Sequence, residues 1–309
     1  MRTVFMGTPD FAVPVLDAMI KAGHEVGYVI TQPDKARNRG KQVQFTPVKK
    51  LAAANGIPVL QPQKIRNSPE TLEILKEYAP DIIVVVAYGQ ILQKEILELP
   101  KYGCVNVHAS LLPKLRGASP IQHAILVGEE KSGVTIMQMG EGMDTGDMLT
   151  RVSTPVGHKN GEELHDELSQ LGARLLVDTL VLIEEGMVTP EPQDDSLSTY
   201  AGMITKADGK IDFEKSPVQI ERQIRAFDPW PGAYCSLGER TMKVWKAEVT
   251  GKAADAAKGT VIDVSGDGID VCCGGGVLRI TELQMPGKKR VTVDAFLRGN
   301  KIEKGTILV

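Results

Sequence analysis

The sequence contains little of what marks secreted, membrane or metal-binding proteins. Its 309 residues include four cysteines, with neither a Cys-x-x-Cys pair nor nearby histidines, so zinc binding and redox chemistry are not expected. The longest strongly apolar run, Ile82 to Ala87, is far too short to span a bilayer. No signal-peptide or transit segment precedes the first predicted strand. We therefore expect a cytoplasmic protein that holds no metal and does not enter a membrane.

The glycine fingerprint of dinucleotide-binding proteins, Gly-x-Gly-x-x-Gly, is also missing. The first predicted strand, 3–6, runs into Gly7-Thr8-Pro9-Asp10, where proline and aspartate replace the second glycine that would let a pyrophosphate approach. A nicotinamide cofactor is therefore not expected. Aromatic residues make up only 5% of the chain. Their scarcity in the last third argues against general single-strand binding, which depends on stacking platforms.

Length and charge suggest two parts of different character. A hydrophobic content of 42% and a charged content of 24% are ordinary for a globular protein, and 309 residues exceed one compact core of usual size. The net charge of −3 divides into −6 for residues 1–200 and +3 for residues 201–309. A basic tail is compatible with a polyanionic partner, although a solvated charged face is the commoner cause.

Strands and amphipathic helices alternate in the first part of the chain. Strands are predicted at 3–6, 26–31, 58–60, 81–87, 103–108 and 133–139, and helices at 10–22, 48–55, 68–78, 119–127 and 160–185. Asp10 is expected to cap the first helix. The segment 32–46 has no apolar periodicity and is expected to be a long basic loop. The alternation predicts an α/β fold with a Rossmann-like, doubly wound and mostly parallel sheet.

The composition changes after residue 188. Residues 188–208 are rich in proline, aspartate, serine and threonine, and we expect a linker at 189–208. A helix at 217–227, the rigid turn Phe227-Asp-Pro-Trp-Pro-Gly-Ala and five short strands follow, separated by glycine-rich turns. Five short strands predict a small OB-like β-barrel. The expected division is thus a first domain at 1–188, the linker, and a C-terminal domain at 209–309.

One stretch concentrates polar residues at the end of a strand, namely Asn106 to Gly117. Alternation places Asn106 and His108 on one face near the carboxyl end of the strand, where open α/β sheets bind ligands. A lone histidine more often only satisfies a backbone carbonyl. The later turn Gly140 to Asp147, rich in glycine, is long enough to bring Asp144 back towards His108. By itself, an acidic turn of this kind is more often a plain loop.

Asn-x-His, then Ser-Leu-Leu-Pro-x-x-Arg-Gly, and a later Asp-Thr-Gly-Asp resemble the signature of the folate-dependent formyltransferases. The resemblance implies that Asn106, His108 and Asp144 are catalytic and that 10-formyltetrahydrofolate is the formyl donor. It also implies a folate site with two parts. Its lining would be Ser110, Leu111, Leu112 and Pro113, and the wall for the pterin ring would be Ala87, Tyr88, Gly89 and Gln90.

These three residue types suit formyl transfer to an amine. The reaction passes through a tetrahedral oxyanion, for which Asn106 offers a neutral donor and His108 a second donor or an acid for the departing nitrogen. Asp144 would favour protonated His108 and could accept the proton of the amine through a water molecule. An α-amino group is already a good nucleophile near neutral pH, so no covalent serine or cysteine is needed.

The catalytic signature does not identify the acceptor, because glycinamide ribonucleotide and sugar-nucleotide formyltransferases share it. The basic insertion 32–41, the motif 227–233 and the barrel-like tail resemble the members that formylate initiator methionyl-tRNA. The implied tRNA contacts are Arg39, Lys41, Lys206 and Lys210, with Arg116 supporting the catalytic loop. Gly202 and Met203 depart from the usual pattern of the linker. A monomer is expected.

Two alternatives remain open. One is a sugar-nucleotide N-formyltransferase with the same catalytic residues. The other is a non-catalytic nucleic-acid binder in which the tail barrel binds and the first domain is a relic. The intact group of Asn106, His108 and Asp144 argues against the relic.

Overall fold

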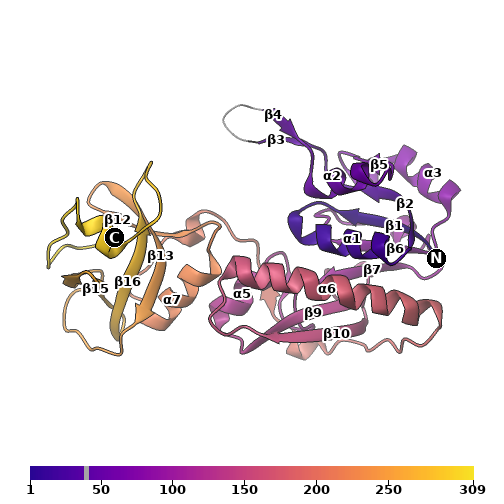
Figure 1. The fold of residues 1–309 in the computed structure, drawn as a ribbon. Helices are drawn as coiled ribbons and strands as arrows, with labels where there is room; N and C mark the ends of the chain where they lie inside the picture. The colour runs from indigo at the N-terminus through magenta and orange to yellow at the C-terminus, as the bar shows by residue number, and fades with distance from the viewer. Residues whose placement is uncertain (38–41) are drawn as a thin grey trace. The chain divides into compact units, whose positions relative to one another are not determined.

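The structure is a computed structural model that describes the backbone of residues 1–37 and 42–309 and the side chains outside 35–43. Two compact units are present (Figure 1). The first comprises Met1–Pro120, Lys131–Pro155 and His165–Ala201, and the second comprises Ile121–Glu130, Val156–Leu164 and Gly202–Val309. Among the described residues, no helix is both long and apolar enough to cross a bilayer.

The first unit is built on a seven-stranded sheet with the order β10-β9-β7-β6-β1-β2-β5. The strands are β1 (Arg2–Gly7), β2 (Glu25–Ile30), β5 (Val59–Leu60), β6 (Ile82–Val86), β7 (Cys104–His108), β9 (Lys131–Gln138) and β10 (Met148–Pro155). Strands β5, β2, β1, β6 and β7 pair in parallel, whereas β9 and β10 pair antiparallel. All five residues of β6 are apolar and buried, as expected for a central strand.

Helices cover both faces of this sheet. They are α1 (Val13–Lys21), α2 (Pro47–Ala54), α3 (Pro69–Tyr78), α4 (Lys94–Leu97) and α6 (Gly161–Glu184), with the short turn η2 (Ile65–Asn67). Leu75 of α3 and Ile96 of α4 pack in one core cluster with Cys104 of β7. On the opposite face, a side chain at Gly172 of α6 would meet Val107 of β7 at 2.9 Å. The predicted doubly wound α/β fold is confirmed.

Three local predictions for this unit were wrong or incomplete. Asp10 does not cap α1, because the chain first forms the 3₁₀ turn η1 (Asp10–Ala12), and neither start has a side-chain cap. The predicted loop 32–46 contains an antiparallel pair, β3 (Lys35–Arg37) and β4 (Gln42–Gln44). Arg39 and Lys41 lie outside the described residues. The strand β10 was not predicted.

The second unit is an antiparallel sheet that its own last residues close. Its strands follow the order β12 (Ala233–Leu237), β13 (Arg240–Val249), β16 (Gly276–Gln284), β15 (Gly268–Cys273) and β14 (Val261–Ser265), with β17 (Val291–Thr292) beside β16. Val309 and Ser236 of β12 exchange backbone hydrogen bonds, and the Leu308 amide donates to the Gly259 carbonyl, before β14, at 2.8 Å. The five predicted strands and the OB-like barrel are thus confirmed.

Three helices accompany the barrel residues in this unit. They are α5 (Pro120–Val127), α7 (Pro217–Ala226) and α8 (Val293–Leu297). A capping box starts α7, because the Ser216 hydroxyl accepts from the Gln219 amide while the Gln219 side chain accepts from the Ser216 amide. Ile220 and Ile224 of α7 join the barrel core.

The segment after α6 is held against the first unit as far as Ala201. Met148 and Glu191 exchange backbone hydrogen bonds of 2.9 Å, and β11 (Tyr200–Ala201) pairs in parallel with β8 (Arg116–Gly117). The turns η3 (Asp195–Leu197) and η4 (Ala207–Gly209) lie in the same stretch of sequence. Residues expected to be part of a linker therefore make specific contacts beside the predicted catalytic strand.

Candidate active site

The candidate site begins at the carboxyl end of β7. Side chains alternate along the strand, so Cys104, Asn106 and His108 share the face on which Cys104 packs against α4. His108 is only 6% exposed, whereas Asn106 is half-buried. The structure records no hydrogen bond from the Asn106 amide to any described side chain or backbone group. The Asn106 amide therefore keeps its hydrogen-bonding capacity within the described residues.

The two ring nitrogens of His108 face different partners. Nε2 lies 3.1 Å from the Leu115 carbonyl oxygen, and because a carbonyl can only accept, Nε2 carries the proton. Nδ1 lies 3.7 Å from Asp144 Oδ2. Nε2 therefore has the common structural role of a buried histidine, which is a hydrogen bond to a backbone carbonyl. The other nitrogen faces the carboxylate that the sequence predicted to return here.

Asp144 is fixed by its backbone and by one strong contact. Its φ of 53° lies in the left-handed region, which aspartate tolerates better than most residues. Its Oδ2 accepts a hydrogen bond of 2.8 Å from the Gly117 amide, and the side chain is 16% exposed. Two residues later, a side chain on Gly146 would meet the Gln138 carbonyl oxygen at 1.8 Å. The turn therefore needs glycine at position 146 to keep its backbone this close to Gln138.

The predicted folate residues fall into two groups. At Ser110 to Pro113, the Thr135 hydroxyl donates to the Ser110 carbonyl at 2.7 Å and accepts from the Leu112 amide at 3.2 Å. Leu112 is 2% exposed and packs in a small apolar cluster with Met137 and Met148. This segment is therefore held rigidly against β9.

The second group lies at the end of β6, around a cavity of about 310 Å³. The cavity is lined by Ala87, Tyr88 and Gly89 together with Thr8, Pro9, Gln32, Pro33, Gln44 and Thr46. Gln90 turns elsewhere, since its Oε1 accepts from the Ile65 amide at 2.7 Å. Burial raises the pKa of Tyr88 to about 12, so its hydroxyl stays protonated.

Arg116 and Gln193 connect the catalytic loop to the segment after α6. Gln193 Oε1 accepts from Arg116 Nε at 3.0 Å and Nη2 at 2.8 Å, and Arg116 Nη2 also bonds Asp195 at 2.7 Å. The expected supporting role of Arg116 thus has a partner that the sequence did not identify. Gln193 stands in a proline- and aspartate-rich stretch without periodicity, so no local signal marks it.

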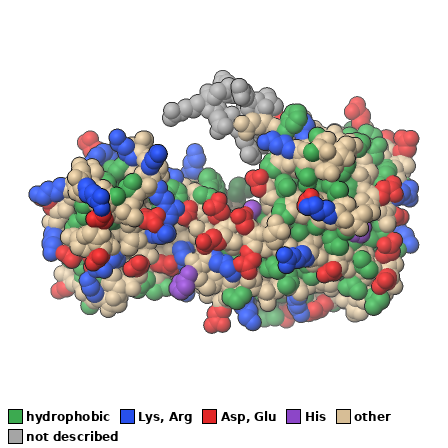
Figure 2. All heavy atoms as spheres, in the orientation of Figure 1, with side chains coloured by type: hydrophobic (Ala, Val, Ile, Leu, Met, Phe, Trp, Pro, Cys, Tyr) green, Lys and Arg blue, Asp and Glu red, His purple; other side chains and the backbone are tan. Residues whose placement is uncertain are grey.

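In the second unit, two motifs that are separate in sequence meet on one surface. Arg290 Nη1 bonds Asp228 at 2.9 Å, and a side chain on Gly232 would meet Lys243 and Trp245 within about 3.2 Å. Lys243 and Arg290 lie 5.0 and 5.2 Å from the Trp245 ring. Figure 2 shows Lys and Arg side chains, interspersed with carboxylates, across the visible face of the barrel unit. Lys206 and Lys210 are exposed in the same unit.

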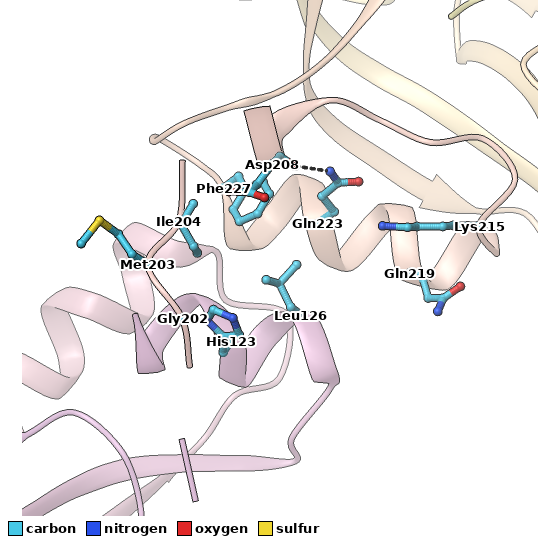
Figure 3. A pocket seen from close by; sticks show the side chains of 10 residues that line it. All are labelled: His123, Leu126, Gly202, Met203, Ile204, Asp208, Lys215, Gln219, Gln223 and Phe227. Atoms are coloured by element: carbon cyan, nitrogen blue, oxygen red, sulfur yellow. Dashed lines mark hydrogen bonds between the residues drawn. The ribbon is translucent and has the colours of Figure 1, made fainter. Parts of the chain in front are cut away.

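A further cavity of about 370 Å³ lies within the second unit. Figure 3 shows its lining, which is His123, Leu126, Gly202, Met203, Ile204, Asp208, Lys215, Gln219, Gln223 and Phe227. Gln223 Nε2 donates to the Asp208 carbonyl at 2.7 Å and to the Lys210 carbonyl at 3.0 Å. The cavity contains none of the predicted catalytic or folate residues. Among the residues that the structure describes, no cluster suited to a metal ion occurs in either unit.

Comparison with known proteins gives a consistent family. Residues 1–180 match the family described as formyl transferase, and residues 203–301 match the formyl transferase C-terminal domain. The methionyl-tRNA formyltransferase of Citrifermentans bemidjiense is 48% identical over 309 residues, covering 100% of this chain and 96% of that protein. The methionyl-tRNA formyltransferase of Clostridioides difficile is 50% identical over 309 residues, covering 100% of both chains.

A solved structure supports the fold. The N-formyltransferase of Helicobacter canadensis, in complex with folinic acid and dTDP-3-aminofucose, has a TM-score of 0.68 and 22% identity. The match covers 92% of this chain and 98% of that one. At this identity the likeness establishes the shared fold and leaves the acceptor open.

Proposed function

The chain belongs to the formyl transferase family, and from this premise we propose that it formylates initiator methionyl-tRNA. The formyl group of 10-formyltetrahydrofolate would pass to the α-amino group of the methionine, giving N-formylmethionyl-tRNA for translation initiation. The observation that carries the chemistry is the pairing of His108 Nδ1 with Asp144 Oδ2 at 3.7 Å, on the strand face that bears Asn106.

In the proposed reaction, the amine nitrogen attacks the formyl carbon and negative charge develops on the formyl oxygen. A donor aimed at that oxygen stabilises the transition state more than the ground state. Asn106 suits this role because its amide is half-buried at the strand end and makes no recorded hydrogen bond within the described chain.

His108 and Asp144 divide the proton transfers. The bond from the formyl carbon to the folate nitrogen breaks, and that nitrogen needs a proton, while the attacking amine must lose one. As an imidazolium, His108 would give one ring proton to the folate nitrogen and return to the neutral form, in which Nε2–H stays with the Leu115 carbonyl and Nδ1 faces Asp144. Asp144 stabilises the imidazolium and accepts the proton of the amine through a water molecule.

For the donor, we propose that Ser110 to Pro113 line the folate site and that the backbone of Ala87 to Gln90 forms the wall for the pterin ring. Support comes from the rigid attachment of Ser110 and Leu112 to Thr135 and from the cavity at Ala87 to Gly89. No metal is required, because Asn106 and His108 supply the electrophilic assistance.

For the acceptor, we propose that tRNA contacts Arg39, Lys41, Lys206 and Lys210, with the surface around Trp245 on the barrel. Cations beside an aromatic ring, here half-buried Lys243 and exposed Arg290, suit a phosphate backbone with unpaired bases. In this scheme residues 1–188 are catalytic, 189–208 link and 209–309 bind tRNA. A monomer in the cytoplasm is the expected state.

Three variants test the catalytic assignment. Asn106→Ala, His108→Ala and Asp144→Asn should each lower kcat for formylation of initiator methionyl-tRNA by about 10²–10³-fold, the usual cost of losing one such group. Their thermal transitions and folate binding should stay near those of the parent. His165→Ala is the matched histidine control, because His165 contacts Asp166 and Phe11 and lies outside the proposed site. Normal turnover by folded Asp144→Asn would remove Asp144 from the mechanism.

A further inference from the structure

We propose that Gln193 is a positioning residue that holds Asp144 beside His108. The inference rests on the proposed catalytic role of Asp144. It adds a residue outside the family signature, located 49 positions beyond Asp144 in the chain.

The Gln193 side chain makes four hydrogen bonds. Its Nε2 donates to the Asp144 carbonyl at 2.8 Å and to the Gly146 carbonyl at 2.7 Å. Its Oε1 accepts from Arg116 Nε at 3.0 Å and Nη2 at 2.8 Å. Both donors and both lone pairs of the amide are thereby used.

These bonds join the two segments that carry the catalytic contacts. On one side is the turn with Asp144 and Gly146, and on the other is Arg116, whose neighbours hold the catalytic side chains. The Leu115 carbonyl accepts from His108 Nε2, and the Gly117 amide donates to Asp144 Oδ2. Gln193 therefore sets the spacing between the carboxylate and the imidazole.

No other common side chain can replace this amide. Glutamate keeps the length and the contacts to Arg116, but it presents an acceptor to two carbonyl oxygens and repels the turn of Asp144. Methionine keeps the volume and loses all four bonds. Misplacement of a catalytic group by about 1 Å can lower the rate by about 10²-fold.

The backbone around Gln193 is held independently of its side chain. Glu191 pairs with Met148 through two backbone bonds of 2.9 Å. On the other side, the Thr199 hydroxyl accepts from the Leu115 amide at 2.9 Å and its carbonyl accepts from the Arg116 amide at 2.9 Å. A substitution at 193 should therefore move the Asp144 turn while the segment 191–199 stays attached.

Asp195 offers a matched control. It also contacts Arg116, at 2.7 Å, but its side chain is 82% exposed and it does not touch the Asp144 turn. An exposed ion pair contributes little to stability. Asp195→Ala removes a contact to Arg116 and leaves Gln193 in place.

The test is a double-mutant cycle on formyl transfer with the full-length protein. Gln193→Glu should lower kcat by about 10- to 100-fold with KM for 10-formyltetrahydrofolate changed by less than about twofold. Asp195→Ala should match the parent. In the Asp144→Asn background, Gln193→Glu should lower kcat by no more than about twofold, because a residue that acts through Asp144 has nothing left to position.

Each outcome of this cycle either supports or contradicts the positioning role of Gln193. Parent-like kcat in Gln193→Glu, while Asp144→Asn is inactive, would overturn the positioning role and leave the proposed function standing. Losses that multiply across the two sites would assign Gln193 a general structural role instead. An active Asp144→Asn would remove both the base and its positioning residue. If Gln193→Glu lacks a cooperative thermal transition, Gln193→Met replaces it.

Hydrogen exchange of the backbone amides of residues 140–148 should be faster in the folded Gln193 variant and unchanged in Asp195→Ala.

Discussion

The buried carboxylate of Asp270 organises charge inside the barrel unit. Its side chain is 2% exposed and accepts from Arg279 Nε at 2.6 Å and Nη2 at 2.9 Å, with Lys252 Nζ at 3.0 Å. The hydrogen bonds from Arg279, and then from Lys252, hold the pKa of Asp270 below its usual value against the opposing effect of burial. The charged form is therefore favoured in the folded state.

The ionised Asp270, bonded to Arg279 and Lys252, makes the stability of the barrel depend on pH. A lowered folded-state pKa stabilises the protein above the unfolded value of about 4, and that contribution is lost as pH falls through the lowered value. Asp270→Asn should destabilise the barrel at pH 7 by about 2 kcal/mol, less than a fully buried pair because both cations reach water. The difference in free energy of unfolding between parent and variant should become smaller below about pH 4.

Urea unfolding followed by tryptophan fluorescence measures this effect, because both tryptophans, Trp230 and Trp245, lie in the second unit. Asp263→Asn is the control, since its pair with Lys304 is solvent-exposed. An equal gap between parent and Asp270→Asn at pH 7 and pH 3 would contradict the linkage.

At the active site, the sequence predicted chemistry better than it predicted contacts. Period-two alternation was enough to place Asn106 and His108 on one face. The return of Asp144 depends on a left-handed backbone, a Gly117 amide and a close approach at Gly146, none of which has a local sequence signal. Gln193 was missed for the same reason, because its partners are distant in sequence.

Among the elements, the turn that carries Asp144 allows a direct test of backbone placement. Gly146→Ala forces a methyl group against the Gln138 carbonyl oxygen, where the present distance to an added Cβ is 1.8 Å, so the turn must move. We expect kcat for formyl transfer to fall by about 10-fold or more. Gly140→Ala is the control in the same turn, because an added Cβ there meets nothing within 4 Å. Equal activity of the two variants would contradict a fixed turn.

Elements with strong apolar periodicity were predicted, whereas several short or largely polar elements were not. The buried strand β6 and the helix α3, with Pro69 at its first position, have clear local signals. The strands β3 and β4 have three residues each and are largely polar, and β10 alternates polar residues at the sheet edge. Their strand conformation depends on partners elsewhere in the chain, which propensity does not report.

The whole molecule combines a sheet that sequence patterns predict with closures that they do not. The alternation of strands and helices was sufficient for the α/β unit, and the five short strands for the barrel. Barrel closure depends on Leu308 and Val309 bonding to residues about 50 and 70 positions earlier, and no local pattern encodes such contacts. The attachment of residues 191–201 to the first unit is non-local in the same way.

The proposed tRNA surface predicts a salt-dependent interaction of the complete protein with its acceptor. Neutralised phosphates release counterions, so the KM for initiator methionyl-tRNA should rise with salt. Exposed Lys288 and Lys289 precede Arg290, and the Lys288 carbonyl accepts from Gln284, which in turn accepts from Trp245 Nε1. The double variant Lys288→Ala, Lys289→Ala should raise the KM for tRNA and reduce its salt slope by about one to two units, with KM for the folate unchanged. Lys301→Ala is the control, since Lys301 is exposed and pairs with Glu303. An unchanged slope would remove this cluster from the tRNA surface.

The central claim is formyl transfer to one class of acceptor. The most direct measurement offers 10-formyltetrahydrofolate with initiator methionyl-tRNA, elongator methionyl-tRNA and a 4-amino sugar nucleotide in parallel assays. The account predicts formylation of the initiator alone, abolished in the His108→Ala and Asp144→Asn variants. Transfer to the sugar nucleotide but not to the tRNA would keep the catalytic group and contradict the acceptor assignment.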